Sequence, residues 1–287
     1  MARKLDKTEE MPTTGHEWDG IREYDTPMPR WWILTFYGTI IFSVIYVILY
    51  PAIPLVNGAT PGILGYSTRA EVAEEIAAFR DANAALDEQL VETELTAIAD
   101  DADLNRYATA GGAAIFKTYC AQCHGAGAAG AVGYPNLLDD AWLWGGDIEN
   151  IHQTISHGIR SDTDFDTRFS EMPAFGDNYL SDEEITAVAE YVYSLTNDDA
   201  DATLAAAGAE TFVNECSACH GENAEGNIDL GAPNLADAIW LYGGDRETLI
   251  ETITYSRAGM MPPWVDRLTE AQIRQVSAYV HQLGGGE

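Results

Sequence analysis

Two pentapeptides, Cys120–His124 and Cys216–His220, share the pattern Cys-x-x-Cys-His and constrain this chain more than any other feature. Thiols three residues apart reach the two vinyl groups of one haem, and the imidazole that follows lies beneath the iron. The motifs use all four cysteines, so none remains for a disulfide. The sequence therefore predicts two covalently bound haem c groups. The first would use Cys120, Cys123 and the axial ligand His124, and the second Cys216, Cys219 and the axial ligand His220.

Two other kinds of site also use Cys-x-x-Cys pairs, namely zinc sites and thiol redox sites. Zinc ribbons do not require a histidine directly after each pair, and here the pairs begin as far apart as residues 120 and 216. A thioredoxin-type motif is expected to follow a strand and to occur once. The repeated histidine therefore favours haem over both alternatives.

The sequence around the motifs is also repeated, which indicates two copies of one domain. Glycine, phenylalanine and cysteine recur four residues apart, so each trio lies on one face of a helix leading into the motif. Each copy closes with an amphipathic helix that a capping box begins, at Ser181 and at Thr269. No strand alternation occurs, so we expect two all-α domains, at residues 105–198 and 199–287. The matching segments are Gly112/Phe116/Cys120 and Gly208/Phe212/Cys216, Pro135–Leu137 and Pro233–Leu235, and Trp142–Asp147 and Trp240–Asp245.

The second axial ligand of each iron must lie between the haem motif and the closing helix. A Met-Pro pair occupies this place in both copies, beginning at Met172 and at Met261. A thioether favours reduced iron and raises the potential. The predicted ligand pairs are therefore His124 with Met172 and His220 with Met261. Met260 stays an alternative in the second copy, although alignment of the Met-Pro pairs favours its neighbour.

Several polar features occur in one copy only. His152, His157 and His281 have no histidine at the equivalent position of the other copy, so we expect surface or locally paired side chains. The first copy also has nine extra residues between its aromatic motif and its methionine, around the sequence SDTDFDTRFSE. We expect this polar stretch to be a surface loop.

A membrane helix is predicted at residues 31–54. No charged side chain occurs between residues 31 and 67, and the segment Trp31–Tyr50 is apolar and aromatic. At about 1.5 Å per residue this segment spans the roughly 30 Å hydrocarbon core, with aromatic residues at both ends. Pro51 then ends the helix. A cleaved signal peptide is disfavoured, because the apolar run is long and residues 1–30 precede it.

The basic residues near this helix predict its orientation. Only Arg69 and Arg80 follow it closely, whereas five bases precede it: Arg3, Lys4, Lys7, Arg22 and Arg30. The positive-inside rule then assigns residues 1–30 to the cytoplasm, and the linker 55–104 and both haem domains to the periplasm. Covalent haem attachment by this motif also occurs on the outer side of bacterial membranes. We therefore expect a single-pass protein of the bacterial inner membrane.

Residues 68–99 of the linker are predicted to form a partly amphipathic helix. Thr68 and Glu71 fit a capping box, and apolar residues from Val72 to Leu95 recur at partial helical spacing. We expect the helix to pack on a haem domain or a partner subunit, because an isolated spacer would leave its apolar stripe exposed.

The acidic residues are concentrated after the membrane helix. The chain has 46 acidic and 15 basic residues, and 39 of the acids but only ten of the bases lie in residues 68–287. Such a field steers a basic partner, for example a soluble cytochrome. A saline habitat is an equally good explanation, since the chain has only three lysines. No nucleic-acid partner is expected.

These residues together resemble the dihaem, membrane-anchored subunit III of cbb3-type cytochrome c oxidases, over nearly the whole chain. The segments Thr13–Ile21 and Pro27–Trp32 and the Tyr50-Pro51 pair are part of the match. Haem motifs alone are common to many cytochromes, but their combination with these segments and the Trp-Leu-(Trp/Tyr)-Gly-Gly motifs is far more specific. The resemblance implies two tandem class I cytochrome c-like domains after one transmembrane helix, and His/Met ligation of both irons.

The resemblance also implies an electron-transfer subunit without a catalytic site of its own. Electrons would come from a soluble cytochrome c or the bc1 complex and pass to the monohaem subunit. They would then reach the catalytic haem-copper subunit of a proton-translocating oxidase, which reduces oxygen to water. One alternative is a dihaem peroxidase-like enzyme, which needs an open iron site. The other is the cytochrome subunit of a membrane dehydrogenase.

The resemblance further assigns residues that support the haems. In class I cytochromes a proline carbonyl supports the proximal histidine, which gives this role to Pro135 and Pro233. Arg160 and Arg257 are candidate partners of the haem propionates, with a surface role as the comparable alternative. Trp142 and Trp240, from the aromatic motifs, are further candidates to line the sites.

Overall fold

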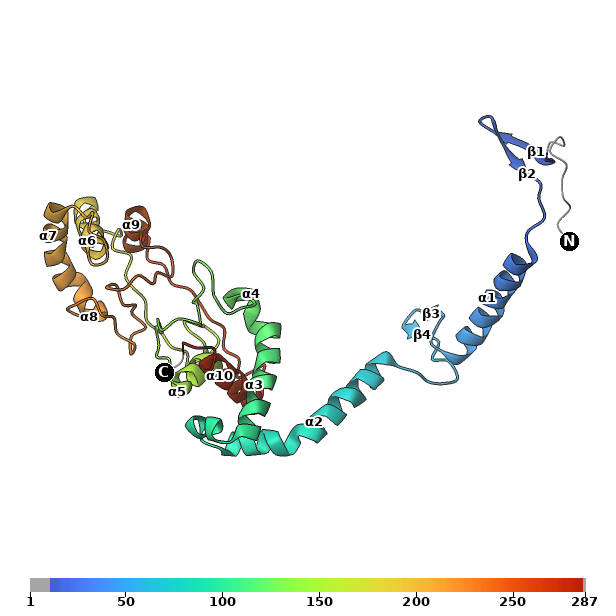
Figure 1. The fold of residues 1–287 in the computed structure, drawn as a ribbon, viewed down its shortest axis with the longest axis horizontal. Helices are drawn as coiled ribbons and strands as arrows, with labels where there is room; N and C mark the ends of the chain where they lie inside the picture. The colour runs from blue at the N-terminus through green and yellow to red at the C-terminus, as the bar shows by residue number, and fades with distance from the viewer. Residues whose placement is uncertain (1–10, 286–287) are drawn as a thin grey trace. The chain divides into compact units, whose positions relative to one another are not determined.

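The computed structural model describes residues 11–285 and is mainly helical, which confirms the expected fold class (Figure 1). The chain divides into two compact units, an N-terminal unit of residues 1–82 and a C-terminal unit of residues 83–287. The apolar helix belongs to the N-terminal unit, and both haem motifs belong to the C-terminal unit. Among the described residues, the two short β hairpins both lie in the N-terminal unit.

A hairpin that the sequence analysis did not predict precedes the apolar helix. Strand β1 (Thr13–Trp18) pairs antiparallel with strand β2 (Ile21–Tyr24). Asp19 and Gly20 join them with φ angles of 48° and 86°. These are the left-handed conformations that an Asp-Gly turn adopts readily.

Helix α1 (Arg30–Leu49) is the candidate membrane helix. It begins one residue before the predicted membrane helix, 31–54, and ends five residues before the predicted end, and none of its side chains is buried within the protein. Its length and composition are sufficient to cross a membrane. Tyr50 leaves the helical conformation, because the residue before a proline disfavours it. A second hairpin follows, made of β3 (Pro54–Leu55) and β4 (Gly58–Ala59).

The linker forms helix α2 (Thr68–Glu92) and the 3-10 helix η1 (Leu95–Asp100). Ser67, and not Thr68 as expected, caps α2, because the Ala70 amide donates to its Oγ over 3.3 Å. The end of the linker packs as expected, whereas Val72, Ile76 and Phe79 of the predicted apolar stripe are exposed. Leu90 is fully buried in an apolar cluster with Ile98 and residues of the C-terminal unit.

The C-terminal unit is built from helices, most of them capped by an acidic or hydroxyl side chain. Both expected capping boxes are present, at Ser181 and Thr269. Each haem motif begins where a longer helix, α3 or α7, runs into a π-helical turn that ends at the first cysteine. The elements are α3 (Ala102–Ile115), η2 (Phe116–Cys120), α4 (Ala121–His124), α5 (Ile148–His157), α6 (Asp182–Ser194), α7 (Ala202–Thr211), η3 (Phe212–Cys216), α8 (Ser217–His220), α9 (Arg246–Tyr255) and α10 (Glu270–His281).

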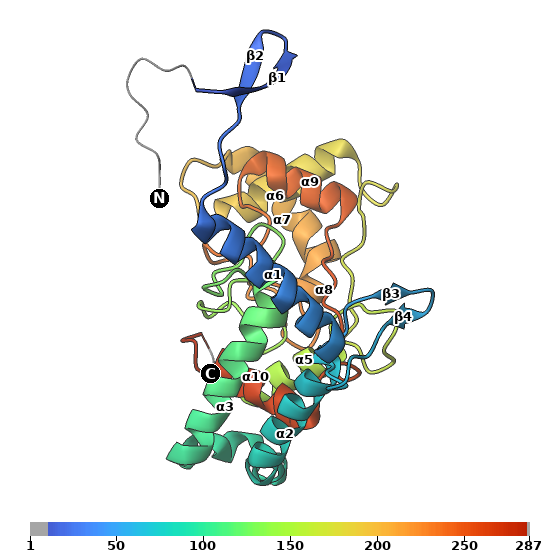
Figure 2. The same cartoon turned by 90° about the vertical axis from the view of Figure 1, so that its right-hand side faces the viewer.

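The two repeats exchange their closing helices. Helix α10 packs against α3 and α5, while α6 packs against α7 and α9, as both views show (Figures 1 and 2). The expected boundaries, 105–198 and 199–287, instead assumed that α6 would close on α3. A short connection, residues 195–201, joins α6 directly to α7, and helices joined by a short loop usually pack side by side. Two cores result: a first core of α3, α5 and α10, and a second core of α6, α7 and α9.

The repeated glycines allow these helix pairs to approach closely. A Cβ at Gly112 would overlap the backbone of α10 at Gln275, and a Cβ at Gly208 would overlap the backbone of α6 at Ala187. Next to these contacts, Phe116 lies against Tyr279 with ring centroids 5.5 Å apart. Each repeat thus supplies the glycine and phenylalanine, and the other repeat supplies the helix that covers them.

Candidate haem sites

The first haem motif opens onto an apolar cavity in the first core. His124 is the last residue of the short helix α4, and its Nδ1 lies 3.0 Å from the Pro135 carbonyl oxygen. Burial lowers the pKa of His124, partly offset by this hydrogen bond, so the ring is neutral and its Nε2 is available to a metal. The cavity is lined by apolar side chains of η2, α5, α10 and the aromatic motif, including Phe116, Trp142, Ile155 and Val276.

Met261, and not Met172, lines the cavity of His124. Its amide and carbonyl groups form a reciprocal pair with Ile159, with N–O distances of 2.9 and 3.0 Å. The expected pairing within each repeat therefore differs from this structure, because the segment before α10 crosses to the first core together with that helix. Met260 is 64% exposed and lies outside the lining of the cavity.

The second haem motif has the reciprocal arrangement. His220 is buried, and its Nδ1 lies 3.0 Å from the Pro233 carbonyl oxygen. Met172 packs against the second core, as do Cys216 and Trp240. The Ser256 hydroxyl, just after α9, donates to the Met172 carbonyl over 2.6 Å. The structure therefore associates Met172 with the motif of the second repeat.

The four cysteines do not form one metal site. Cys120 packs against the first core and Cys216 against the second, and no cysteine belongs to a possible metal-binding cluster among residues 11–285. Burial raises the pKa of Cys120 and of Cys216 to about 11. Redox thiols instead have a lowered pKa, since the thiolate is the reactive form. These observations disfavour both alternatives to haem.

The two sites meet across a tightly packed interface within the C-terminal unit. The Gly133 amide donates to the Leu241 carbonyl over 2.8 Å. Gly133 also packs against the ring of Tyr242, and Gly231 packs against the ring of Trp144. Each aromatic motif thus covers a glycine in the loop after the opposite haem motif.

One arginine in this region was missed by the sequence analysis. Arg168 lies over the Trp144 ring, 5.3 Å from its centroid, just as Arg257 lies 5.3 Å from that of Tyr242. Each precedes its methionine by four residues, so counting back from the Met-Pro pairs would have matched them. Arg160, the expected candidate, instead donates to the carbonyls of Gly259 and Ser170.

Unpaired buried donors near the aromatic motifs suit a bound anionic group. The Nε1 of Trp144 and the Nε of Arg168 and Arg257 are buried without a hydrogen-bond partner among the described residues. Buried donors usually find a partner. Haem carries two propionates, so the orphan donors, the apolar cavity, the free thiols and the neutral imidazoles all fit haem c.

The other histidines have local partners, as expected. His152 Nε2 lies 3.2 Å from Glu270 Oε1, and His157 Nδ1 lies 3.1 Å from an Asp164 carboxylate oxygen. His281 also has an interaction partner. None of them lines the cavity of His124.

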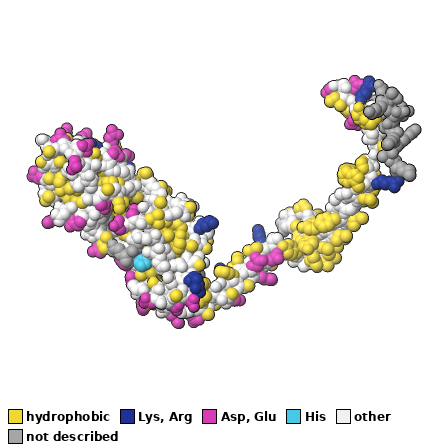
Figure 3. All heavy atoms as spheres, in the orientation of Figure 1, with side chains coloured by type: hydrophobic (Ala, Val, Ile, Leu, Met, Phe, Trp, Pro, Cys, Tyr) yellow, Lys and Arg dark blue, Asp and Glu magenta, His cyan; other side chains and the backbone are white. Residues whose placement is uncertain are grey.

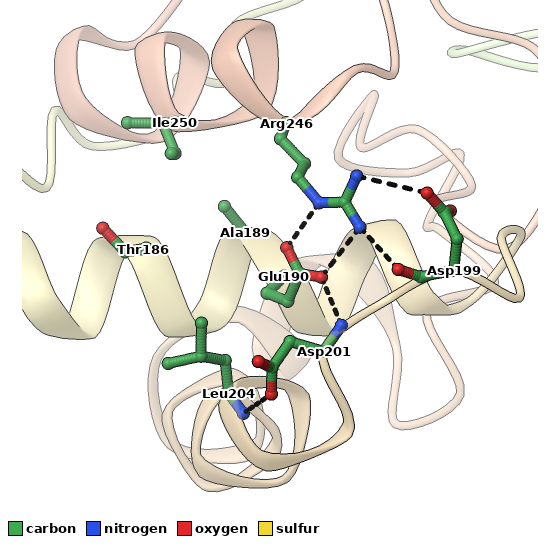
Figure 4. A pocket seen from close by; sticks show the side chains of 8 residues that line it. All are labelled: Thr186, Ala189, Glu190, Asp199, Asp201, Leu204, Arg246 and Ile250. Carbon is green, nitrogen blue, oxygen red and sulfur yellow. Dashed lines mark hydrogen bonds and ion pairs between the residues drawn. The ribbon is translucent and has the colours of Figure 1, made fainter.

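A separate polar pocket occurs in the second core, away from the haem motif (Figure 4). Arg246 donates to both carboxylate oxygens of the buried Glu190 and to the Asp199 carbonyl, and its guanidinium lies 4.0 Å from the centre of the Tyr193 ring. In the first core, apolar Ile148 and the linker's Leu90 pack together instead. In the second core, the Arg246–Glu190 ion pair therefore lies at the place where Leu90 of the linker packs in the first core.

Acidic side chains are spread over the visible face of the C-terminal unit, while α1 shows mainly apolar ones (Figure 3). Together with the paired haem motifs, this defines a membrane-anchored cytochrome of the c type. Comparison with known sequences then gives the family. Residues 10–57 match the model for the N-terminal domain of cytochrome oxidase-cbb3, FixP. Residues 108–192 and 203–280 match the model for cytochrome c oxidase, cbb3-type, subunit III.

Similar proteins match over almost their whole length. The chain is 62% identical to the cbb3-type cytochrome c oxidase subunit CcoP of Cereibacter sphaeroides, covering 98% of this chain and 97% of that protein. It is 51% identical to CcoP of Rhodobacter capsulatus over both complete chains. It is 47% identical to subunit FixP of Sinorhizobium medicae, covering 99% and 98%. The chain belongs to the CcoP family of cbb3-type oxidase subunits, so it is an electron-transfer subunit that binds haem c and is not catalytic alone.

Proposed function

We propose that the chain binds two haem c groups and conducts electrons through both of them. The iron attached at Cys120 and Cys123 would lie between His124 and Met261, and the iron attached at Cys216 and Cys219 between His220 and Met172. The proposal is carried by one observation, that Met261 lines the same apolar cavity as His124.

Haem c supplies a one-electron couple when it is bound. The residues of this chain set its properties. The Pro135 and Pro233 carbonyls orient the proximal rings, and the apolar linings exclude water. Met261 and Met172 would hold the irons through their sulfurs, and a haem held in this way would have no open position for oxygen. Such a centre transfers electrons, whereas a peroxidase-like enzyme needs an open iron site.

Two features support passage of electrons between the haems and from an outside donor. Both motifs belong to one compact unit, in which the Gly133–Leu241 contact joins the loop after the first motif to the aromatic motif of the second repeat, so neither haem depends on a mobile domain. The acidic surface favours a basic donor. The donor would be a soluble cytochrome c or the bc1 complex. The acceptors would be the monohaem cytochrome subunit and then the catalytic haem-copper subunit.

The orientation in the inner membrane is part of the proposal. Arg22 precedes α1 and Arg30 is its first residue, while Arg3, Lys4 and Lys7 lie outside the described residues. The excess of bases before the helix favours a cytoplasmic N-terminus and periplasmic haem sites.

Purification in mild detergent, followed by haem staining and identification of co-purified subunits, tests this function. We expect a haem-copper subunit, two haem c groups per chain, and low-spin ferric spectra. A high-spin ferric haem in the intact protein would contradict His/Met ligation. Co-purification with a dehydrogenase instead of a haem-copper subunit would contradict the role in the oxidase.

A further inference from the structure

The segment directly after α1, residues 51–66, forms a folded structure that we call the juxtamembrane cap. Its hairpin is closed by two hydrogen bonds: the Thr60 amide donates to the Ile53 carbonyl, and the Ile53 amide donates to the Thr60 hydroxyl. The chain then folds back onto the end of α1. Figures 1 and 2 both show the hairpin beside this end of the helix.

The cap is fixed to the last turn of α1. The Ile63 and Leu64 amides donate to the Ile48 and Leu49 carbonyls over 2.9 and 3.1 Å. These carbonyls would otherwise lack partners at the helix end. Gly62 has a φ of 69°, and a Cβ there would overlap the Leu49 carbonyl. The cap and the end of the helix therefore behave as one rigid surface.

That surface is apolar and uncharged. No Asp, Glu, Lys or Arg occurs in the cap. Its large apolar side chains are exposed: Val56 at the hairpin tip is fully so, and Ile63 is 76% exposed, with Ile53, Leu55 and Leu64 also among the exposed residues. Figure 3 shows the apolar side chains gathered in this part of the N-terminal unit. Exposed apolar patches of this kind mark interaction sites.

The composition of the cap favours a protein over lipid headgroups as its partner. Amphipathic segments that bind the membrane interface usually carry Lys or Arg on their polar face. The cap contains neither of these residue types, but it has Pro51, Pro54 and Pro61. The prolines, and the amides that donate to the end of α1, fix the shape of the cap. A fixed shape favours close packing against another protein surface in or near the membrane. The patch also continues directly from α1.

We propose that the juxtamembrane cap is the surface by which this chain docks onto another subunit of the oxidase, at the end of the membrane helix. The partner surface would be uncharged and apolar, and would contact α1 and the cap together. The proposal rests on the proposed function only in that the chain is part of an oxidase complex.

Site-specific photo-crosslinking in the complete oxidase tests this docking. The photoreactive residue p-benzoylphenylalanine would be placed at Val56 and, as a matched control, at Val265, an exposed valine of the C-terminal unit. We expect a covalent adduct with another oxidase subunit from position 56 and none from position 265. A lipid adduct at position 56, or no adduct, would overturn the proposal.

Charge substitution gives an independent test. Val56→Asp would bury an unpaired carboxylate at the interface, which lowers the amount of chain recovered with the complex roughly tenfold or more. Val265→Asp should leave recovery unchanged. Haem staining of the membrane-bound chain shows whether each variant folds. Normal recovery of a folded Val56→Asp chain would contradict docking, while co-purification of the wild-type chain would still support the proposed function.

Discussion

Because the closing helices are exchanged, a methyl group added at Gly112 should destabilise the packing of α10 and not that of α6. In Gly112→Ala, the new Cβ overlaps the Gln275 carbonyl of α10 and comes within 2.6 Å of the Tyr279 Cβ. Neither backbone nor Cβ can rotate away, so α3 and α10 must separate. Overpacking of this kind costs about 1–3 kcal/mol. The substitution should therefore destabilise the packing of α10 on α3, because α10 and not α6 covers Gly112.

Gly111→Ala is the matched control. A Cβ at Gly111 meets only the side-chain amide of Gln275, which is flexible and can move. Both variants gain the same helix propensity from alanine, about 1 kcal/mol, so their difference isolates the packing cost. That difference corresponds to a roughly 5- to 150-fold change in a local opening equilibrium.

Hydrogen–deuterium exchange of the full chain, followed by mass spectrometry, measures this opening. In Gly112→Ala, amides of α3 and α10 should exchange faster than in Gly111→Ala by this factor, and those of α6 and α7 should not change. The reciprocal variant Gly208→Ala should affect α6 and α7. Faster exchange in α6 on substitution of Gly112, with α10 unaffected, would refute the exchanged packing.

Three further predictions concern the irons, the linker and pH. Met261→Ala and Met172→Ala should each lower the reduction potential of one haem in a redox titration, by a sizeable part of the roughly 0.8 V that axial ligands span. The control Met260→Ala should change neither potential. A shifted potential in Met260→Ala would make Met260 the ligand. Leu90→Ala, which truncates a fully buried side chain, should lower the melting temperature of the C-terminal unit by roughly 4–20 °C. The control is Val91→Ala at the exposed neighbour. Equal decreases in melting temperature for the two variants would contradict packing of the linker. Hydrogen bonds from Arg246 lower the pKa of Glu190 in the folded chain. The ionised carboxylate therefore stabilises the fold when the pH is above the ordinary pKa of glutamate, about 4.3. This stabilisation is lost as the pH falls through the lower pKa of the folded state. Glu190→Gln should therefore flatten the dependence of melting temperature on pH between about pH 5 and 3, and an unchanged profile would count against the ion pair.

Local features of the fold were predictable from sequence because their causes are local. The caps at Ser181 and Thr269 follow from side chains three residues apart, and the uncharged run predicts α1. The β1–β2 hairpin also has a local signal, the Asp19-Gly20 pair, which the sequence analysis did not use. Arg168 could similarly have been found by counting back from Met172.

The exchange of helices has no such local signal. Gly112 and Gly208 offer nearly the same surface, and α6 and α10 carry matching apolar faces with equivalent tyrosines, Tyr191 and Tyr279. Either helix would fit either core, so the repeat pattern alone cannot assign a partner. The choice depends on chain connectivity, through the short link from α6 to α7. The methionines follow their helices, and the predicted ligand pairs therefore differed from the arrangement in the structure.

The sulfur ligand on each iron distinguishes the exchanged arrangement from ligation within each repeat. An electron cryo-microscopy map of the intact oxidase, at a resolution that separates side chains, identifies this ligand. We expect the Met261 sulfur on the iron above His124, and the Met172 sulfur on the iron above His220. Met172 on the iron of His124 would contradict the exchanged arrangement.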